Sequence, residues 1–250
     1  MSEWVPPLSL KERLKTLFVP AGLNLHYLTK REKKKGEREF RILPLICPRG
    51  RVALDVGANI GIWAYEMRKY ASFIHAFEPN PKLFAMLKAG IAGQNVSLHP
   101  IALSDRTGDS QLMVPKGKRG YSNYSATLNH ETVRGATYRA TQVSTSRLDD
   151  LHIANVGFIK IDVEGHEMEV IRGAKETILS SRPNMIIEME ERHTKRPIDD
   201  DIQEIEDLGY DSFCMINGVL ERVKNIDLDA HHRSPVRRAD YIFNWIFMPR

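Results

Sequence analysis

The sequence predicts an α/β fold of the Rossmann-like type, in which a mostly parallel, seven-stranded sheet carries helices on both faces. From residue 51 onward, short apolar runs typical of strands alternate with segments of helical periodicity. A turn with two glycines follows the first of these runs, as in folds that bind nucleotides. The chain has 250 residues, of which 42% are hydrophobic, so it is long enough for one core and fits a single domain.

Local signals place the individual elements. Asn80-Pro81 combines an N-cap residue with proline at the first helical position, Pro183 ends a later helix, and Gly209 caps the last one. The expected strands cover residues 51–56, 73–77, 96–103, 157–163 and 185–189, with antiparallel edge strands at 211–216 and 241–247. The expected helices cover residues 60–70, 81 to 90 or 93, 166–181 and 199–208.

Two parts of the chain stand outside this alternation. We expect an N-terminal helical extension over residues 1–48, with a helix at 9–18 because Ser9-Leu10-Lys11-Glu12 has the pattern of a capping box. The Rossmann-like domain then covers 49–250. Residues 110–145 interrupt its alternation, and we expect an inserted hairpin or lid there.

Charge and cysteine content narrow the class of protein. Because 36 Lys and Arg stand against 32 Asp and Glu, the net charge of +4 does not indicate nucleic acid as a partner. The two cysteines are too few for a disulfide framework, and no apolar stretch approaches the roughly 20 residues of a membrane span. We therefore expect a cytoplasmic protein. The basic run Lys30–Lys35 is either a solvated helix end or a contact with an anionic substrate or membrane surface.

The segment Asp55-Val-Gly-Ala-Asn-Ile-Gly61 lies where Rossmann-like folds bind nucleotide cofactors. Gly57 permits a backbone conformation closed to other residues, and Gly61 lets the following helix pack tightly on the strand. Glu78 ends the second strand, 21 residues after Gly57, where a carboxylate can accept both hydroxyls of a ribose. These features alone admit NAD as well as S-adenosylmethionine.

The turn itself favours S-adenosylmethionine. Its spacing is G-x-x-x-G, whereas a pyrophosphate usually requires G-x-G-x-x-G. Asp55 would repel a pyrophosphate but suits a ligand with an amino group and a sulfonium. Asp105 either accepts from the adenine amino group or forms a turn. The expected cofactor contacts are Asp55, Gly57, Ala58, Asn59, Gly61, Glu78, Pro79, Ser104, Asp105 and Asp162.

Five segments together resemble the FkbM-type methyltransferases. They are VALDVGANIGIWA (52–64), HAFEPNP (75–81), IALSDRTGD (101–109), SRLDDL (146–151) and FIKIDVEGHEMEVIRGA (158–174). The resemblance covers roughly residues 50–190 and leaves out 1–45 and 115–140. It implies a class I methyltransferase fold, S-adenosylmethionine as methyl donor, and O-methylation of hydroxyls on sugars or polyketide-like natural products.

Methyl transfer to an alcohol requires a base or a metal ion near the hydroxyl. Alternation along the strand 157–163 places Lys160, Asp162 and Glu164 on one face, next to the first strand. We expect Asp162 nearest the methyl group, as base, metal ligand or anchor for the methionine amino group. Glu164 would bind the acceptor hydroxyl. Lys160 would orient Asp162 or offset its charge, or else form a structural ion pair.

The identity of the base stays open among Asp162, Glu164 and His193. A Mg²⁺ ion held by Asp162 and Glu188 is an alternative to the favoured metal-free mechanism, and no metal ligands are assigned. In the insertion, Tyr121 and Tyr124 with neighbouring cations suit a glycan or an anionic acceptor, unless they form only a basic loop.

The sequence therefore predicts an S-adenosylmethionine-dependent O-methyltransferase that acts on a hydroxyl of a sugar, in a glycan or a natural-product glycoside. Two alternatives remain. One is methylation of RNA or of a protein side chain, and the other is a non-catalytic cofactor-binding protein with the same fold.

Overall fold

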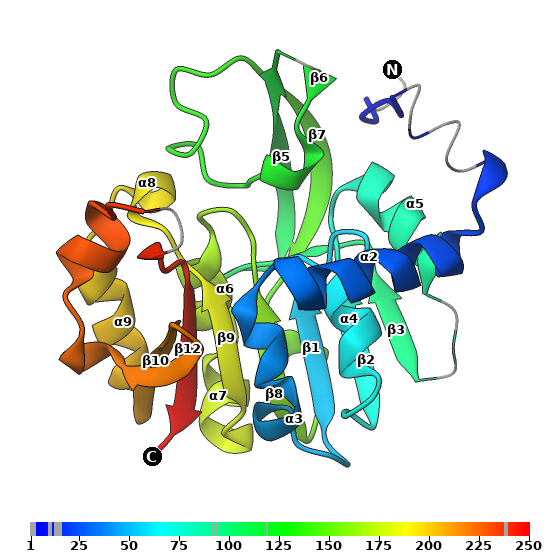
Figure 1. Ribbon diagram of the computed structural model, residues 1–250. Coiled ribbons are helices and arrows are strands. Elements are labelled where there is room, and N and C mark those ends of the chain that lie inside the picture. Colours follow the sequence, from blue (N-terminus) through cyan, green and yellow to red (C-terminus); the bar gives the residue numbers. More distant parts are fainter. Residues whose placement is uncertain are drawn as a thin grey trace.

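Figure 1 shows the fold in a computed structural model, which describes residues 4–9, 12, 17–91, 93, 95–118, 120–237 and 240–250. A large sheet runs through the molecule in the order β11-β10-β12-β9-β8-β1-β2-β3. Its parallel strands are β1 (Val52–Val56), β2 (Phe73–Phe77), β3 (Val96–His99), β8 (Val156–Ile161) and β9 (Asn184–Glu188). β12 (Asn244–Pro249), β10 (Tyr210–Ile216) and β11 (Val219–Arg222) are paired antiparallel.

The prediction of seven strands is wrong, because the sheet has eight and is mixed. The additional strand β11 is joined to β10 by Asn217-Gly218, whose φ angles of 50° and 83° make a tight two-residue turn. An Asn-Gly pair between two apolar runs is the sequence signal for such a hairpin. The two strands expected at the edge, at 211–216 and 241–247, correspond to β10 and β12 but lie inside the sheet. β12 lies between β10 and β9, and the edge strands are β11 and β3.

Two expected elements are divided. The strand expected at 96–103 ends at His99, and β4 (Ala102–Leu103) belongs to a second sheet. Pro100 lies between them, and proline has no N–H to continue a ladder. The helix expected at 166–181 consists of α6 (Glu167–Gly173) and α7 (Lys175–Ser181). Gly173 lies so close to the backbone of Ser104 that a Cβ there would come within 1.9 Å of its carbonyl oxygen.

Other elements agree with the sequence analysis. α5 (Pro81–Gly90) begins where Asn80 predicts, and the Asn80 side chain accepts hydrogen bonds from the N–H groups of Lys82 and Leu83. α4 (Ile62–Met67) and α9 (Ile198–Glu206) lie within or close to the expected ranges. The shorter elements are α3 (Leu43–Ile46), η1 (Arg38–Arg41), η2 (Asn123–Ser125), η3 (Asp149–Leu151), α8 (Glu191–Thr194), η4 (Val223–Asn225) and η5 (Asp229–Arg233).

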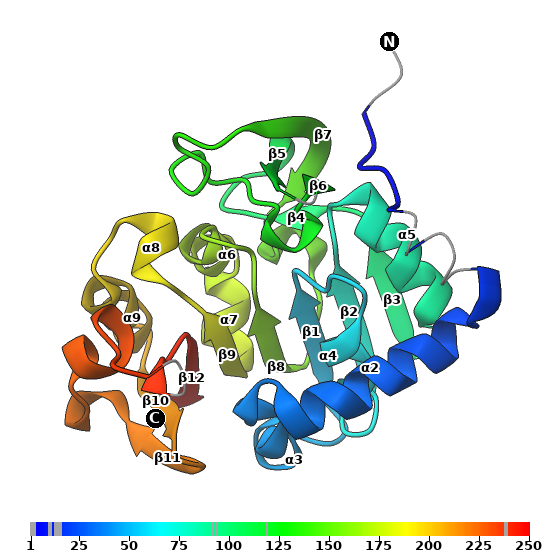
Figure 2. The same ribbon diagram turned by 45° about the horizontal axis from the view of Figure 1, so that its top comes forward.

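Helices cover both faces of the large sheet, as Figure 2 shows with the top of the molecule turned forward. All six residues of β8 are buried, and all but Lys160 are apolar, as expected of a strand that is covered on both faces. Each fully buried Leu or Ile stabilises the fold by about 1.5–3 kcal/mol. The face toward α2 (Ala21–Lys35), α4 and α5 includes Leu25, Trp63, Ile74, Leu87 and Phe158, and the face toward α6, α7 and α9 includes Leu54, Ile159, Ile171, Ile178 and Ile202.

The N-terminal extension contains a helix that ends in the basic run Lys30–Lys35, as one interpretation of that run expected, although its start was not predicted. α2 spans 15 residues and packs across α4 and α5 through Leu25 and Thr29. Most of the helix predicted at 9–18 lies outside the described residues. Its capping box is present: Ser9 N–H donates to Glu12 Oε2 over 2.6 Å, and Glu12 N–H donates to Ser9 Oγ over 3.3 Å. No helix in the described part of the chain combines the length and apolarity that crossing a bilayer requires.

A second sheet stands over the carboxyl ends of the large sheet (Figures 1 and 2). Its order is β4-β7-β5-β6, with β5 (Gly108–Gly117) and β7 (Tyr138–Ser146) forming a long antiparallel hairpin beside β6 (Gly120–Tyr121). We call residues 108–146 the insertion. This hairpin lies where the sequence predicts an inserted hairpin or lid.

Candidate active site

A narrow cleft with a cavity volume of about 60 Å³ lies at the carboxyl ends of β1, β2 and β8, beneath the insertion. Its position is that of a ligand site in an α/β sheet. The strand ends contribute Val56, Gly57, Asn59, Phe77, Glu78, Pro79, Asp162, Val163 and Glu164, and the insertion contributes Leu112, Asn123, Tyr124, Ala126, Thr127 and Leu128. The lining is completed by Leu83, Ile101, Ala102, Leu103 and His166.

The turn after β1 accepts only glycine at position 57. Gly57 has φ +80°, and a Cβ there would come within 1.8 Å of the Asp162 carbonyl oxygen. The N–H groups of Gly57 and Ala58 both donate to the Phe77 carbonyl, over 3.0 and 2.9 Å. The backbone of the turn therefore lies directly against the ends of β2 and β8.

Gly61 has a different role from the one predicted. With φ +91°, its Cα faces α5, and a Cβ would lie 2.6 Å from Leu87 Cδ1 and 2.7 Å from Ile91 Cδ1. The glycine therefore allows a close approach between helices, where the sequence analysis expected packing of a helix on the strand. Gly61 does not line the cleft.

Glu78 is held by the backbone on both sides. It is 5% exposed, and its two oxygens accept hydrogen bonds from Asn59 N–H over 2.7 Å and from Asn80 N–H over 2.8 Å. Burial raises the Glu78 pKa to about 7, although these two donors lower it. Each carboxylate oxygen retains a lone pair, so the side chain can also accept two hydroxyls of a ligand in the cleft.

The opposite end of the cleft carries Asp162 and Glu164. β8 ends at Ile161, so the alternation that was expected to place Lys160, Asp162 and Glu164 on one face stops before the carboxylates. Glu164 adopts a left-handed conformation with φ 56°. Burial, followed by neighbouring carboxylates such as Asp162, raises the Glu164 pKa to about 8. Burial also raises the pKa of Asp162, against the lowering effect of Lys160.

Three side chains, one from α6 and two from the insertion, hold the loop that contains Glu164. Glu167 Oε1 accepts from Gly165 N–H over 2.9 Å. From the insertion, Thr127 Oγ1 donates to the Glu164 carbonyl and Asn129 Nδ2 to the Gly165 carbonyl, each over 2.7 Å. The sequence analysis assigned no role to these three side chains. A role for Glu167 could have been predicted, because Glu167 lies in the same sequence signature as Asp162.

His193 lies behind Glu164. Its Nε2 is 3.6 Å from Glu164 Oε2, and its carbonyl accepts a 3.0 Å hydrogen bond from Thr132 Oγ1 in the insertion. Burial lowers the pKa of the His193 imidazole. A neutral imidazole beside a carboxyl can receive a proton, so this pair is suited to general base chemistry.

Lys160 does not line the cleft. It is fully buried, and its Nζ donates to Asn244 Oδ1 over 3.0 Å and lies 3.9 Å from the carboxylates of Glu37 and Glu188. Burial lowers its pKa, but the surrounding carboxylates, of which Glu37 acts most strongly, raise it more. Lys160 thus forms the structural ion pair that the sequence analysis considered as the alternative role.

Four further expected contacts also lie outside the cleft lining. Asp55 is buried, and its Oδ2 accepts from Ala64 N–H over 2.7 Å in the first turn of α4; burial raises its pKa to about 7. Ala58 is buried beside it. Ser104 Oγ is 2.9 Å from His166 Nε2, and Asp105 is exposed. The wall near them is instead the apolar run Ile101–Leu103.

The charge of the lining favours one class of ligand. It holds three carboxyl groups, on Glu78, Asp162 and Glu164, and no Lys or Arg among the described residues. Such a site suits a cationic or neutral ligand and disfavours a pyrophosphate. Within the described ranges, no three His, Cys, Asp or Glu side chains group so as to hold a metal ion.

The sequence profile described as "Methyltransferase FkbM domain" matches residues 55–212, which is more than half of the chain and includes both ends of the cleft. The chain belongs to the FkbM methyltransferase family. The family is one of methyltransferases. The cleft is therefore the candidate active site of this chain.

Curated relatives match at lower similarity. The hexuronic acid methyltransferase AglP of Haloferax volcanii is 28% identical over 150 residues, which cover 58% of this chain and 59% of that protein. The 31-O-demethyl-FK506 methyltransferase FkbM of Streptomyces tacrolimicus is 29% identical over 208 residues, 67% of this chain and 78% of that protein. The chain spans about 60% of the length of several curated relatives that it matches.

A solved structure supports the fold. The crystal structure of a methyltransferase FkbM from Methylobacillus flagellatus superposes with a TM-score of 0.51 at 14% sequence identity. The match covers 94% of this chain and 60% of that one. At this identity the likeness concerns the arrangement of strands and helices alone.

Proposed function

We propose that this chain is an S-adenosylmethionine-dependent O-methyltransferase that methylates a hydroxyl of a sugar. The observation that carries the proposal is the pairing of two carboxyl groups in one cleft, Glu78 at the end of β2 and Glu164 after β8. The first is placed to accept ribose hydroxyls, and the second to accept the proton of an attacking hydroxyl.

The residues of the cleft fit the cofactor part by part. Glu78 keeps a free lone pair on each oxygen for the two ribose hydroxyls. Ile101–Leu103, with Leu112 and Leu128, offer an apolar wall for an adenine ring. Asp162 provides a carboxyl group for the amino group of the methionine end. When bound, the cofactor supplies an already activated methyl group.

Catalysis then depends on alignment and on removal of one proton. Glu164 acts as the base in this proposal, because its raised pKa of about 8 makes it a stronger proton acceptor than an ordinary carboxylate. His193, 3.6 Å away, can stabilise the negative or the protonated form of that carboxyl through its ring nitrogen. Asp162 lies nearest to the methyl group and anchors the methionine end.

The sugar acceptor is supported by the relatives and by the insertion. One relative is named for a hexuronic acid substrate and another for a 2-O-methyl transfer. Tyr124 of the insertion lines the cleft and is 57% exposed, which provides an aromatic surface of the kind on which sugar rings stack.

Calorimetric titration with S-adenosylhomocysteine, followed by methyl transfer to a panel of glycosides, tests the proposal. We expect binding that Glu78→Ala weakens, and transfer that Glu164→Gln abolishes while binding persists. Absence of binding, or transfer to RNA but to no glycoside, would overturn the assignment.

A further inference from the structure

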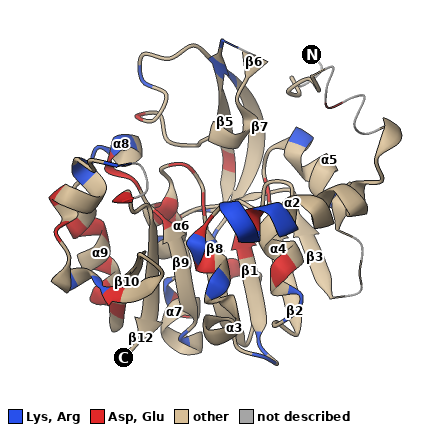
Figure 3. Cartoon of the chain, in the orientation of Figure 1, with Lys and Arg blue, Asp and Glu red and all other residues tan. Residues whose placement is uncertain are grey.

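The surface around α2 combines exposed apolar and cationic side chains. Leu17, Phe18, Leu23 and Tyr27 are 76, 79, 65 and 63% exposed, although large apolar side chains are normally covered. The exposed cations Lys30, Arg31, Lys34 and Lys35 follow along the same helix, where Figure 3 shows Lys and Arg gathered. We call these eight residues the α2 surface.

Helical spacing directs four residues of this surface the same way. Leu23, Tyr27, Arg31 and Lys34 follow one another at intervals of three or four residues, so they form one stripe along α2. The opposite side of the helix packs on the domain through Leu25. Leu23 and Tyr27 can therefore meet one flat partner together with Arg31 and Lys34.

The cations of this surface are available to an external partner. Lys33 is paired with the Glu66 carboxylate at 2.7 Å. Among the described residues, Lys30, Arg31, Lys34 and Lys35 have no ion pair. Four unpaired cations of one sign beside large apolar side chains are complementary to a layer of anionic headgroups over hydrocarbon.

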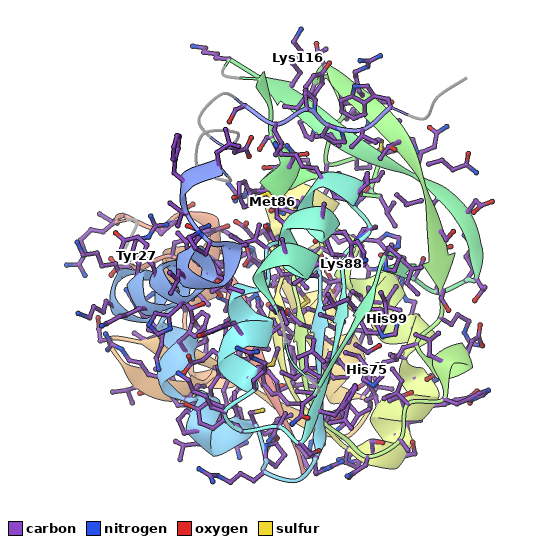
Figure 4. The ribbon with its side chains drawn as sticks, turned by 90° about the vertical axis from the view of Figure 1, so that its right-hand side faces the viewer. Tyr27, His75, Met86, Lys88, His99 and Lys116 are labelled. Carbon is purple, nitrogen blue, oxygen red and sulfur yellow. The ribbon has the colours of Figure 1, made fainter. Side chains whose placement is uncertain are left out.

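A groove opens between this surface and α5. Its volume is about 570 Å³, and it is lined by apolar side chains that include Phe18, Leu28 and Met86. Tyr124 lines both this groove and the cleft, so the two are adjacent. Figure 4 labels Tyr27 on α2 and Met86 on α5, the two helices that flank the groove.

We propose that the α2 surface binds an anionic lipid bilayer. Leu17, Phe18, Leu23 and Tyr27 enter the headgroup region, and the four cations contact the lipid phosphates. This orientation places the mouth of the groove against the membrane, so that an acceptor sugar anchored by an apolar chain reaches the cleft past Tyr124. The consequence for the acceptor rests on the proposed function, whereas the docking itself does not.

Co-sedimentation of the full chain with vesicles tests the docking. We expect binding to phosphatidylcholine vesicles that contain phosphatidylglycerol, little binding to phosphatidylcholine alone, and weakening by salt. The double variant Lys30→Glu/Lys34→Glu should bind at least tenfold more weakly, because each cation near the surface contributes about fivefold. The double variant Lys175→Glu/Lys224→Glu changes the net charge equally at exposed sites elsewhere and should bind as the wild type does.

A second pair of substitutions tests the apolar part. Phe18→Ser/Leu23→Ser should lower vesicle binding with an unchanged unfolding curve, because both side chains are largely exposed. Equal vesicle binding by all variants, or no preference for anionic lipid, would overturn the proposal. Self-association that Phe18→Ser/Leu23→Ser abolishes would assign the surface to a second copy of the chain instead. Binding of S-adenosylhomocysteine, measured in parallel, shows whether a failure concerns the docking or the proposed function.

Discussion

The two ends of the cleft are held in different ways. At one end, Glu78 is fixed by the backbone N–H groups of Asn59 and Asn80, and the turn at Gly57 is joined to β2 and β8 by backbone atoms. At the other end, the Glu164 loop is fixed by side chains, two of which come from the insertion. Backbone anchors belong to the fold itself, whereas side-chain anchors can be altered one at a time without unfolding the protein.

The difference predicts how each end responds to substitution. Changes at the backbone-held end should affect folding and cofactor binding. Changes at the side-chain-held end should affect the rate of methyl transfer more than they affect folding or cofactor binding. The five predictions that follow test this division, beginning with the largest expected effect.

Gly57→Ala should abolish folding or lower the free energy of unfolding by more than about 4 kcal/mol, because the new Cβ meets a carbonyl oxygen. Gly50→Ala is the matched control. Gly50 also has positive φ, +77°, but nothing lies within 4 Å of its Cβ position, so its substitution should cost only about 1–2 kcal/mol. Denaturant unfolding measures both, and equal costs would contradict the role given to the turn.

Glu164→Gln should lower kcat by a factor of about 10² to 10⁴, the usual contribution of a general base. The wild-type rate should rise with pH up to about 8, because the Glu164 carboxyl must lose its proton to act, and the variant should lack this limb. A rate profile unchanged by the substitution would exclude Glu164 as the base.

The same substitution tests the Glu164 pKa through stability. Between the ordinary value of 4.5 and about 8, the native state retains a proton that the unfolded chain has lost. The free energy of unfolding therefore falls as pH rises through this window. Glu164→Gln should reduce that fall.

Glu78→Ala should weaken S-adenosylhomocysteine binding by about 10- to 100-fold, because hydrogen bonds to a charged group contribute about 1.5–3 kcal/mol. Asp105→Ala is the comparison, since the sequence analysis expected Asp105 to contact adenine but the structure places it exposed and outside the cleft lining. Calorimetry should find the affinity of Asp105→Ala close to that of the wild type. A large loss there would restore the expected adenine contact.

Asn129→Ala removes one anchor of the Glu164 loop and should lower kcat about fivefold, the equivalent of one neutral hydrogen bond of about 1 kcal/mol. Cofactor affinity should change little. His130→Ala, at the neighbouring position of the insertion, serves as control. A loss of affinity without a loss of rate would show that the insertion acts on the cofactor end.

The backbone-held end could largely be predicted from the sequence. Gly57, Asn80-Pro81 and Glu78 act through conformational preferences and spacings that are local to the chain, and the structure places Gly57 and Glu78 at one cleft. β11 was also predictable, because Asn217-Gly218 is a local signal that was overlooked.

The side-chain-held end could not be predicted in the same way. Asn129 and Gly165 are 36 positions apart, and no periodicity relates them. Lys160 acts on Asp162 through its charge, as one of the expected roles requires, but it lies within β8 and not in the cleft lining. Its partners Glu37 and Asn244 come from opposite ends of the chain, and only the packed fold brings them together.

A crystal structure of the chain with S-adenosylhomocysteine tests the central claim most directly. The account predicts that both ribose hydroxyls lie within hydrogen-bond distance of the Glu78 carboxylate and that the sulfur faces Asp162 and Glu164. A ligand bound in the reverse direction, or with its ribose away from Glu78, would contradict it.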